Sequence, residues 1–221
     1  MLATFQTPDV PSSLPLPPAG VAPRGDIVRA DRDEEIVTQD DPAADCYLVV
    51  SGCIRTVRLM DDGRRQVGEF LFPGDIFGWE ALDEHDFGAE AVVPSVLRRY
   101  PRRSLEALAD RDPGFARRLR ALTAGQMRAG RQRIVLLGRK TASERIASFL
   151  LEMAKRVGPG GDCVIELPMS RADMADYLGL TIETVCRGLT QLRRAGVIEV
   201  ERARIVIRAR RVLAAAGCET I

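Results

Sequence analysis

Apolar and polar residues alternate in short runs between residues 29 and 100. Such alternation, interrupted by Gly, Pro and Asp, is typical of short strands joined by tight turns. The triplet DDG indicates a hairpin because Gly63 can adopt a positive φ. We therefore predict a compact barrel or roll here. The strand-like runs are CYLVV (46–50), CIRTVRLM (53–60), RQVGEFLF (65–72) and SVLRRY (95–100), and the turns are SG (51–52), DDG (61–63) and PGD (73–75).

The pattern changes near Ser104, after which apolar positions recur every three or four residues. Residues 113–138 contain few turn signals and predict a single helix, and a helix of about 25 residues is long for a globular domain. We expect it to pair with a second copy of the chain; the alternative is a helix that packs only on its own domain. The side chains expected at the dimer contact are Phe115, Leu119, Leu122, Met127, Ile134 and Leu137.

A third segment begins at Thr141 with the predicted helix TASERIASFLLEMAKRV, whose apolar side carries Ile146, Phe149, Leu150 and Met153. After a loop, GPGGD, two short helices follow, SRADMADYLG and TIETVCRGLTQLRRAG, and the hairpin VIEVERARIVIR closes the domain. Two short helices joined at a glycine form a helix-turn-helix.

Cap residues stand where this motif requires them. Ser170 and Asp173 predict a capping box for the first helix, and Gly179 predicts its end. Thr181 can cap the second helix, and Gly196 follows it.

The second helix has an apolar face, with Val185, Leu189 and Leu192, and an opposite polar face. A recognition helix presents such a polar N-terminal part to base edges, whereas a solvated surface helix is the alternative. Arg187 can donate two hydrogen bonds to guanine, and Glu183 can accept one from cytosine. Expected base contacts are Glu183, Thr184, Cys186 and Arg187; expected phosphate contacts, which carry affinity rather than sequence, are Ser170, Arg171, Thr181, Thr190, Arg202 and Arg204.

Charge is divided unevenly along the chain. Residues 1–110 hold 11 Lys and Arg against 20 Asp and Glu, a net of −9, whereas residues 111–221 hold 21 against 11, a net of +10. Solvated helix faces would also account for the basic half, but the asymmetry indicates that this half binds nucleic acid.

The 221 residues are 46% hydrophobic and 29% charged, and no apolar run approaches the roughly 18 residues of a membrane span. The N-terminus lacks the features of a secretory signal and is rich in Pro, so we expect a disordered segment at 1–24 and a cytoplasmic protein. Five cysteines without a CxxC pair argue against disulfides and zinc. With one histidine and no glycine-rich phosphate loop, no catalytic constellation is visible.

Three stretches resemble the Crp/Fnr superfamily of bacterial transcription regulators. LGLTIETVCRGLTQLRRAGVIEV looks like its winged helix-turn-helix, SGCIRTVRLMDDGRRQVGEFLFPGDIFG like its β-roll sensor domain, and TASERIASFLLEMA like the helix after its dimerisation helix. The E-x-x-S-R motif of the Fnr and FixK branch appears at 183–187, with Cys186 in place of serine.

The resemblance implies an α+β fold: a cyclic-nucleotide-binding-like jelly roll at 25–110, a dimerisation helix at 111–138 and a winged helix-turn-helix at 139–221. It also implies a homodimer that reads a two-fold site resembling TTG…CAA and acts with RNA polymerase. Half-sites should lie one helical turn apart, about 34–36 Å. A β-roll interaction module that has lost DNA binding is a further alternative, which the intact Glu183 and Arg187 disfavour.

The roll departs from its cyclic-nucleotide-binding relatives. Trp79 stands where those relatives have a glutamate, and the segment 87–91 lacks their phosphate-binding arginine and carries a carboxylate. The resemblance does not imply an iron–sulfur cluster either. The cluster ligands of Fnr lie mainly in an N-terminal group of cysteines, whereas no cysteine precedes Cys46 here, and Cys46 and Cys53 have the pattern of core residues.

The FixK branch, whose members lack a sensory cofactor, fits these departures best. By resemblance the chain activates genes of microoxic respiration, nitrogen oxide reduction or nitrogen fixation. The alternative is a ligand-gated regulator that uses haem or another small molecule, for nitric oxide or redox sensing, with His85 as an axial ligand. Against it, His85 lies in the charged loop DEHDFG and is expected to be solvated.

Cys186 has two interpretations. It can be a tolerated replacement for serine that contacts a thymine methyl group. Alternatively, it is a redox switch: an exposed thiol near Arg187 and a helix N-terminus oxidises readily, and a sulfinate there would repel DNA phosphates.

Overall fold

The structure is a computed structural model that describes residues 25–81, 83–157 and 164–217. The predicted disordered segment at 1–24 and the loop GPGGD at 158–162 lie outside the described residues.

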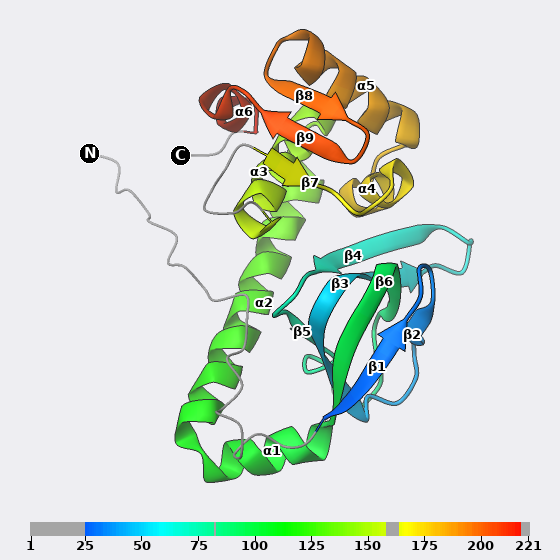
Figure 1. Cartoon of the computed structure of the whole chain (residues 1–221), viewed down its shortest axis with the longest axis vertical. Coiled ribbons are helices and arrows are strands. Elements are labelled where there is room, and N and C mark those ends of the chain that lie inside the picture. The colour runs from blue at the N-terminus through cyan, green and yellow to red at the C-terminus, as the bar shows by residue number, and fades with distance from the viewer. Residues whose placement is uncertain (1–24, 82, 158–163, 218–221) are drawn as a thin grey trace.

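The first half of the chain forms the predicted roll, a six-stranded antiparallel sheet (Figure 1). Its strand order is β1-β6-β3-β4, and β2 and β5 pair with the ends of β6 and β3. Gly63 and Gly74 adopt positive φ in the turns before β4 and β5, as their sequence context predicts. The strands are β1 (Asp26–Ala30), β2 (Glu35–Val37), β3 (Asp45–Leu59), β4 (Arg65–Leu71), β5 (Ile76–Phe77) and β6 (Gly88–Pro101).

The predicted turn at SG is wrong, because β3 continues through it. Gly52 has a φ of +93°, and the register of β3 against β6 shifts on both sides of it. The backbone N–H of Cys53 donates to the Ser95 hydroxyl across this irregularity, at 3.1 Å. Gly52 therefore forms a bulge that bends one long strand around the roll.

Two helices lead out of the roll: α1 (Arg102–Arg111) and α2 (Pro113–Arg139). Pro113 opens α2, and Asp112 caps it by accepting from the backbone N–H of Gly114 at 2.7 Å. The long helix predicted over 113–138 is confirmed. Figure 1 shows α2 running past the roll from α1 to the C-terminal domain.

The expected dimer stripe on α2 divides into two parts. Phe115, Leu119 and Leu122 are buried in a core that their own chain builds with α1 and the roll. The expectation that these three side chains face a partner is wrong, because the turn between α1 and α2 folds the start of α2 back onto the roll. Met127 and Ile134 are exposed, and Leu137 is half-buried.

The C-terminal domain contains the predicted helix-turn-helix and its hairpin. Its helices pack around α3, whose predicted apolar side is buried throughout. The hairpin gains a third strand, giving the order β7-β9-β8; neither β7 nor α6 was expected from the sequence. The elements are α3 (Ala142–Val157), β7 (Val164–Glu166), α4 (Arg171–Leu178), α5 (Ile182–Arg194), β8 (Ile198–Glu201), β9 (Arg204–Ile207) and α6 (Arg210–Ala216).

One apolar core joins the roll to the C-terminal domain. Phe70 of β4 lies with its ring 6.4 Å from that of Phe149 in α3 and 5.2 Å from that of Tyr177 in α4. Because α4 rests against β4, the orientation of the helix-turn-helix depends on the roll (Figure 1).

Candidate nucleic-acid interface

Local hydrogen bonds set the geometry of the helix-turn-helix. Ser170 and Asp173 form the predicted capping box at the start of α4. Gly179 ends α4 in the left-handed region, with a φ of +61°, which favours glycine. The Thr181 hydroxyl accepts from the backbone N–H of Thr184 at 3.3 Å and so caps α5. All three predicted caps are confirmed.

The two predicted faces of α5 are present. Val185 and Leu189 are buried, and Leu192 packs against the same core. The opposite face leaves Glu183, Cys186 and Arg187 exposed near the helix N-terminus.

The Glu183 carboxylate is held in its acceptor state. Hydrogen bonds from its own backbone N–H and from the Thr181 hydroxyl, together with the charge of Arg187, keep its pKa below the usual value. The polar face of α5 thus presents a carboxylate acceptor and a guanidinium donor one helical turn apart.

Three side chains whose hydroxyl groups were expected to contact DNA form hydrogen bonds within the protein. Thr184 is half-buried, and its hydroxyl lies 3.1 Å from that of Thr181. Thr190 donates to the carbonyl oxygen of Cys186 at 2.8 Å. The Ser170 hydroxyl takes part in the capping box. These side chains shape the helices that carry the exposed groups.

The start of α4 lies beside the turn of the β8–β9 hairpin. The guanidinium of Arg171 donates to the carbonyl oxygen of Arg202 at 3.4 Å. Arg202 is exposed and adopts a φ of +55° in that turn. Arg204 is also exposed, and its guanidinium lies 3.4 Å from the carboxylate of Glu201. Three predicted phosphate-contact residues are thereby brought to one end of the domain.

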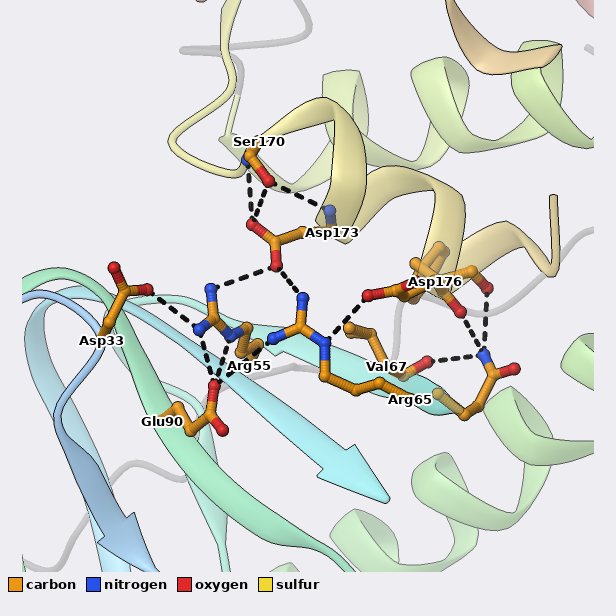
Figure 2. A network of polar contacts seen from close by, with 10 residues as sticks. Asp33, Arg55, Arg65, Val67, Glu90, Ser170, Asp173 and Asp176 are labelled. Carbon is orange, nitrogen blue, oxygen red and sulfur yellow. Dashed lines mark hydrogen bonds and ion pairs between the residues drawn. The ribbon is translucent and has the colours of Figure 1, made fainter. Parts of the chain in front are cut away.

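A cluster of arginines and carboxylates between the roll and α4 was missed by the sequence reading (Figure 2). It contains Arg55 and Arg65 of the roll and Asp173 and Asp176 of α4. One signal was available: Arg55 alternates with Cys53 and Val57, which places it on the same face of the predicted strand as two apolar residues. A buried arginine requires partners.

The two segments that depart from the cyclic-nucleotide-binding pattern make internal contacts. Arg102 donates to the carbonyl oxygen of Trp79 at 3.2 Å, and its guanidinium lies 5.7 Å from the centroid of the Trp79 ring. The Glu90 carboxylate accepts from Arg55 at 2.8 Å.

His85 is buried rather than solvated, which corrects the expectation for its loop. Its backbone N–H donates to the carbonyl oxygen of Asp41, and its carbonyl oxygen accepts from Asp40. These bonds fix the loop against the roll, and burial lowers the pKa of the imidazole.

Cys46 and Cys53 are core residues, as their pattern predicts. They belong to different apolar clusters, and burial raises the pKa of each thiol to about 12. Across the described part of the chain, no three His, Cys, Asp or Glu side chains group as ligands of a metal ion. None of the described helices is both long and apolar enough to cross a membrane.

Comparison with known proteins agrees with this architecture. A model described as a Crp-like helix-turn-helix domain matches residues 144–216, and one described as a cyclic nucleotide-binding domain matches residues 27–112. The nitrogen fixation regulation protein FixK of Azorhizobium caulinodans is 46% identical over 179 residues, which cover 80% of this chain and 72% of that protein. FixK of Rhizobium meliloti is 42% identical over 172 residues, which cover 78% of this chain and 77% of that protein.

The solved structure of FixK2 from Bradyrhizobium japonicum is similar over the whole fold. It superposes with a TM-score of 0.84 at 43% identity, covering 89% of this chain and 99% of that one. These relatives are regulators of transcription and not enzymes. The chain therefore belongs to the Crp/Fnr family of DNA-binding transcription regulators.

Proposed function

We propose that this protein is a FixK-like activator that works as a homodimer, with RNA polymerase, at a two-fold TTG…CAA-type site. Its target genes serve microoxic respiration, nitrogen oxide reduction or nitrogen fixation. The resemblance to FixK proteins, whose names refer to nitrogen fixation, supports this choice. The observation that carries the proposal is the exposed polar start of α5.

Base reading follows from the chemistry of that face. Arg187 has the fork geometry for O6 and N7 of a guanine, and the ionised Glu183 accepts from the N4 amino group of a cytosine. Cys186 lies beside them and can contact a thymine methyl group. Arg171, Arg202 and Arg204, at the start of α4 and on the hairpin, supply phosphate contacts that position the domain without reading sequence.

Dimerisation is supported by the exposed part of α2. Met127, Ile134 and Val135 are spaced by seven and eight residues, which places them on one face of the helix. All three side chains are more than half exposed in the single chain. A second copy that covers this face would place two α5 helices about a two-fold axis, matching a palindromic site.

The internal contacts of the roll support a regulator without a sensory cofactor. Cys46 and Cys53 are desolvated in separate cores, and the loop of His85 is fixed by backbone hydrogen bonds. Trp79 and Glu90 are engaged by arginines of the same chain. A Soret band in protein purified from its native host would contradict this part of the proposal.

Selection of bound sequences from a random DNA pool tests the proposal. The wild-type protein should recover a palindrome. Arg187→Ala should lose about 1–3 kcal/mol of binding free energy and should relax discrimination at one guanine in each half-site. Arg193→Ala is the matched control, because Arg193 is exposed at the other end of the same helix. This control should leave the selected sequence unchanged.

Two results would contradict the proposal. Recovery of a non-palindromic motif would exclude a symmetric reader. An Arg187→Ala protein that binds all sequences more weakly, by one common factor, would show that Arg187 contacts phosphate and not a base.

A further inference from the structure

A guanidinium of the roll is buried among carboxylates at the boundary with the DNA-binding domain (Figure 2). Arg55 of β3 is only 7% exposed. It donates to Glu90 at 2.8 Å and to Asp33 at 2.9 Å within the roll. Its third contact crosses to α4, where it donates to Oδ1 of Asp173 at 3.1 Å.

A second arginine of the roll contacts the same helix. Arg65, at the start of β4, donates to Oδ1 of Asp173 at 2.9 Å and to Asp176 at 2.9 Å. The other carboxylate oxygen of Asp173 accepts from the backbone N–H and the hydroxyl of Ser170. Asp173 therefore completes the capping box of α4 and binds both arginines at once.

Apolar and backbone contacts hold the same boundary. The Tyr177 ring of α4 packs on Phe70 of β4, and the Gln66 side chain donates to the carbonyl oxygen of Asp176 at 2.5 Å. On the other side, Arg133 of α2 lies 3.3 Å from the centroid of the Tyr177 ring and donates to the Tyr177 carbonyl oxygen. Helix α4 is thus held by both the roll and α2.

These contacts have a direct geometric consequence for α5. Only residues 179–181 separate α4 from α5, so the direction of α5 follows that of α4. In the structure, the cluster is formed and the face of α5 with Glu183 and Arg187 is exposed to solvent. The cluster therefore orients the DNA-reading face and does not block it. Charge-assisted hydrogen bonds demand a defined geometry, which suits this role.

We propose that Arg55, Arg65, Asp173 and Asp176 form an interdomain latch that sets the separation and angle of the two recognition helices in the dimer. None of the four contacts DNA; they are positioning residues for a site of fixed half-site spacing. This inference rests on the proposed two-fold DNA recognition and adds the part of the chain that sets its spacing.

The test compares DNA duplexes that differ only in spacing. Binding is measured by fluorescence anisotropy for the selected palindrome, for duplexes with the half-sites one base pair closer or farther apart, and for a single half-site. Arg65→Gln and Asp176→Asn are the informative variants, because both side chains are partly exposed and neither belongs to the capping box. Asp173 is left intact because its replacement would also break the capping box of α4.

Each variant should reduce the preference for the native spacing by at least about threefold while leaving single half-site affinity unchanged. The double variant should lose no more of the spacing preference than Arg65→Gln alone, because both changes break the ion pair between Arg65 and Asp176. Arg64→Gln is the matched control: this neighbouring arginine is exposed and pairs at 2.7 Å with Asp62 of its own hairpin. It should keep the wild-type preference.

The possible failures can be told apart. Variants that unfold at a lower temperature but keep the wild-type spacing preference would overturn the latch and leave the proposed function intact. Wild-type protein that binds no two-fold site would overturn the proposed function itself, and the latch with it. Circular dichroism of each variant confirms that a changed preference does not come from an unfolded domain.

Discussion

Cys186 differs from the other two cysteines that the structure describes. Cys46 and Cys53 are buried, and their thiols resist ionisation because burial raises the pKa of each to about 12. Cys186 is exposed on α5 beside Arg187. The thiolate is the nucleophile that attacks peroxide, so oxidation should begin at the exposed thiol and not in the core.

Peroxide should therefore weaken DNA binding through Cys186. Successive oxidation to sulfenate and sulfinate, with water released at each step, would add a negative charge to the face that approaches DNA. We expect wild-type protein to lose affinity by about tenfold or more after treatment, because like charges would be juxtaposed. Anisotropy with the selected palindrome measures the loss.

Cys186→Ser is the control for this oxidation, because it keeps a small polar side chain at the position. It should bind the palindrome before treatment and retain its affinity afterwards. If wild type and variant lose affinity equally, the switch does not reside at Cys186.

Strand β3 shows how a single glycine shapes an element. A Cβ on Gly52 would lie 2.7 Å from Cα of Ser95 and 2.1 Å from its hydroxyl oxygen, and φ is +93°. Gly63, in the hairpin before β4, has a similar φ of +82° but nothing within 4 Å of a Cβ. The two glycines therefore share the conformational requirement and differ in packing.

Gly52→Ala should lower the free energy of unfolding by about 2 kcal/mol or more, because backbone strain adds to overpacking against β6. Gly63→Ala should cost only the strain, about 1 kcal/mol. Urea denaturation of the two variants measures both values. Equal losses would show that Ser95 can move aside and that the bulge is not tightly packed.

At the scale of the whole molecule, we propose that the second half of α2 carries the dimer contact. Its first half is used within the chain, where Phe115, Leu119 and Leu122 are buried. Ile134 is 73% exposed, and burying a charge at that position against a second copy would be costly.

Ile134→Glu should raise the dimer dissociation constant by at least about tenfold and weaken binding to the palindrome, since each dimer carries the change twice. Analytical ultracentrifugation measures the association. Val212→Glu is the control, because Val212 is also more than half exposed but lies on α6. If Ile134→Glu remains dimeric, the partner does not cover this face.

Much of the DNA-binding domain was predictable because its signals are local. The capping box at Ser170, the left-handed Gly179 and the cap at Thr181 each involve residues a few positions apart. The faces of α5 follow from helical periodicity alone. The roll was predictable as a class, but the SG pair was misread, since a glycine with positive φ serves a bulge as well as a turn.

The interdomain contacts were not predictable in the same way. Arg55 and Asp173 are 118 residues apart in the chain, and no local pattern couples them. The burial of His85 likewise depends on backbone bonds to a different loop, at Asp40 and Asp41.

The sequence by itself determined the helix-turn-helix, its caps and the exposed Glu183 and Arg187, because neighbouring residues encode hydrogen bonds and periodicity. The family was indicated separately, by the resemblance of its motifs. Only the tertiary structure decided which part of α2 stays exposed and how α4 is oriented on the roll. Those features arise where distant segments meet, and there packing and ion pairing, rather than local propensity, determine the arrangement.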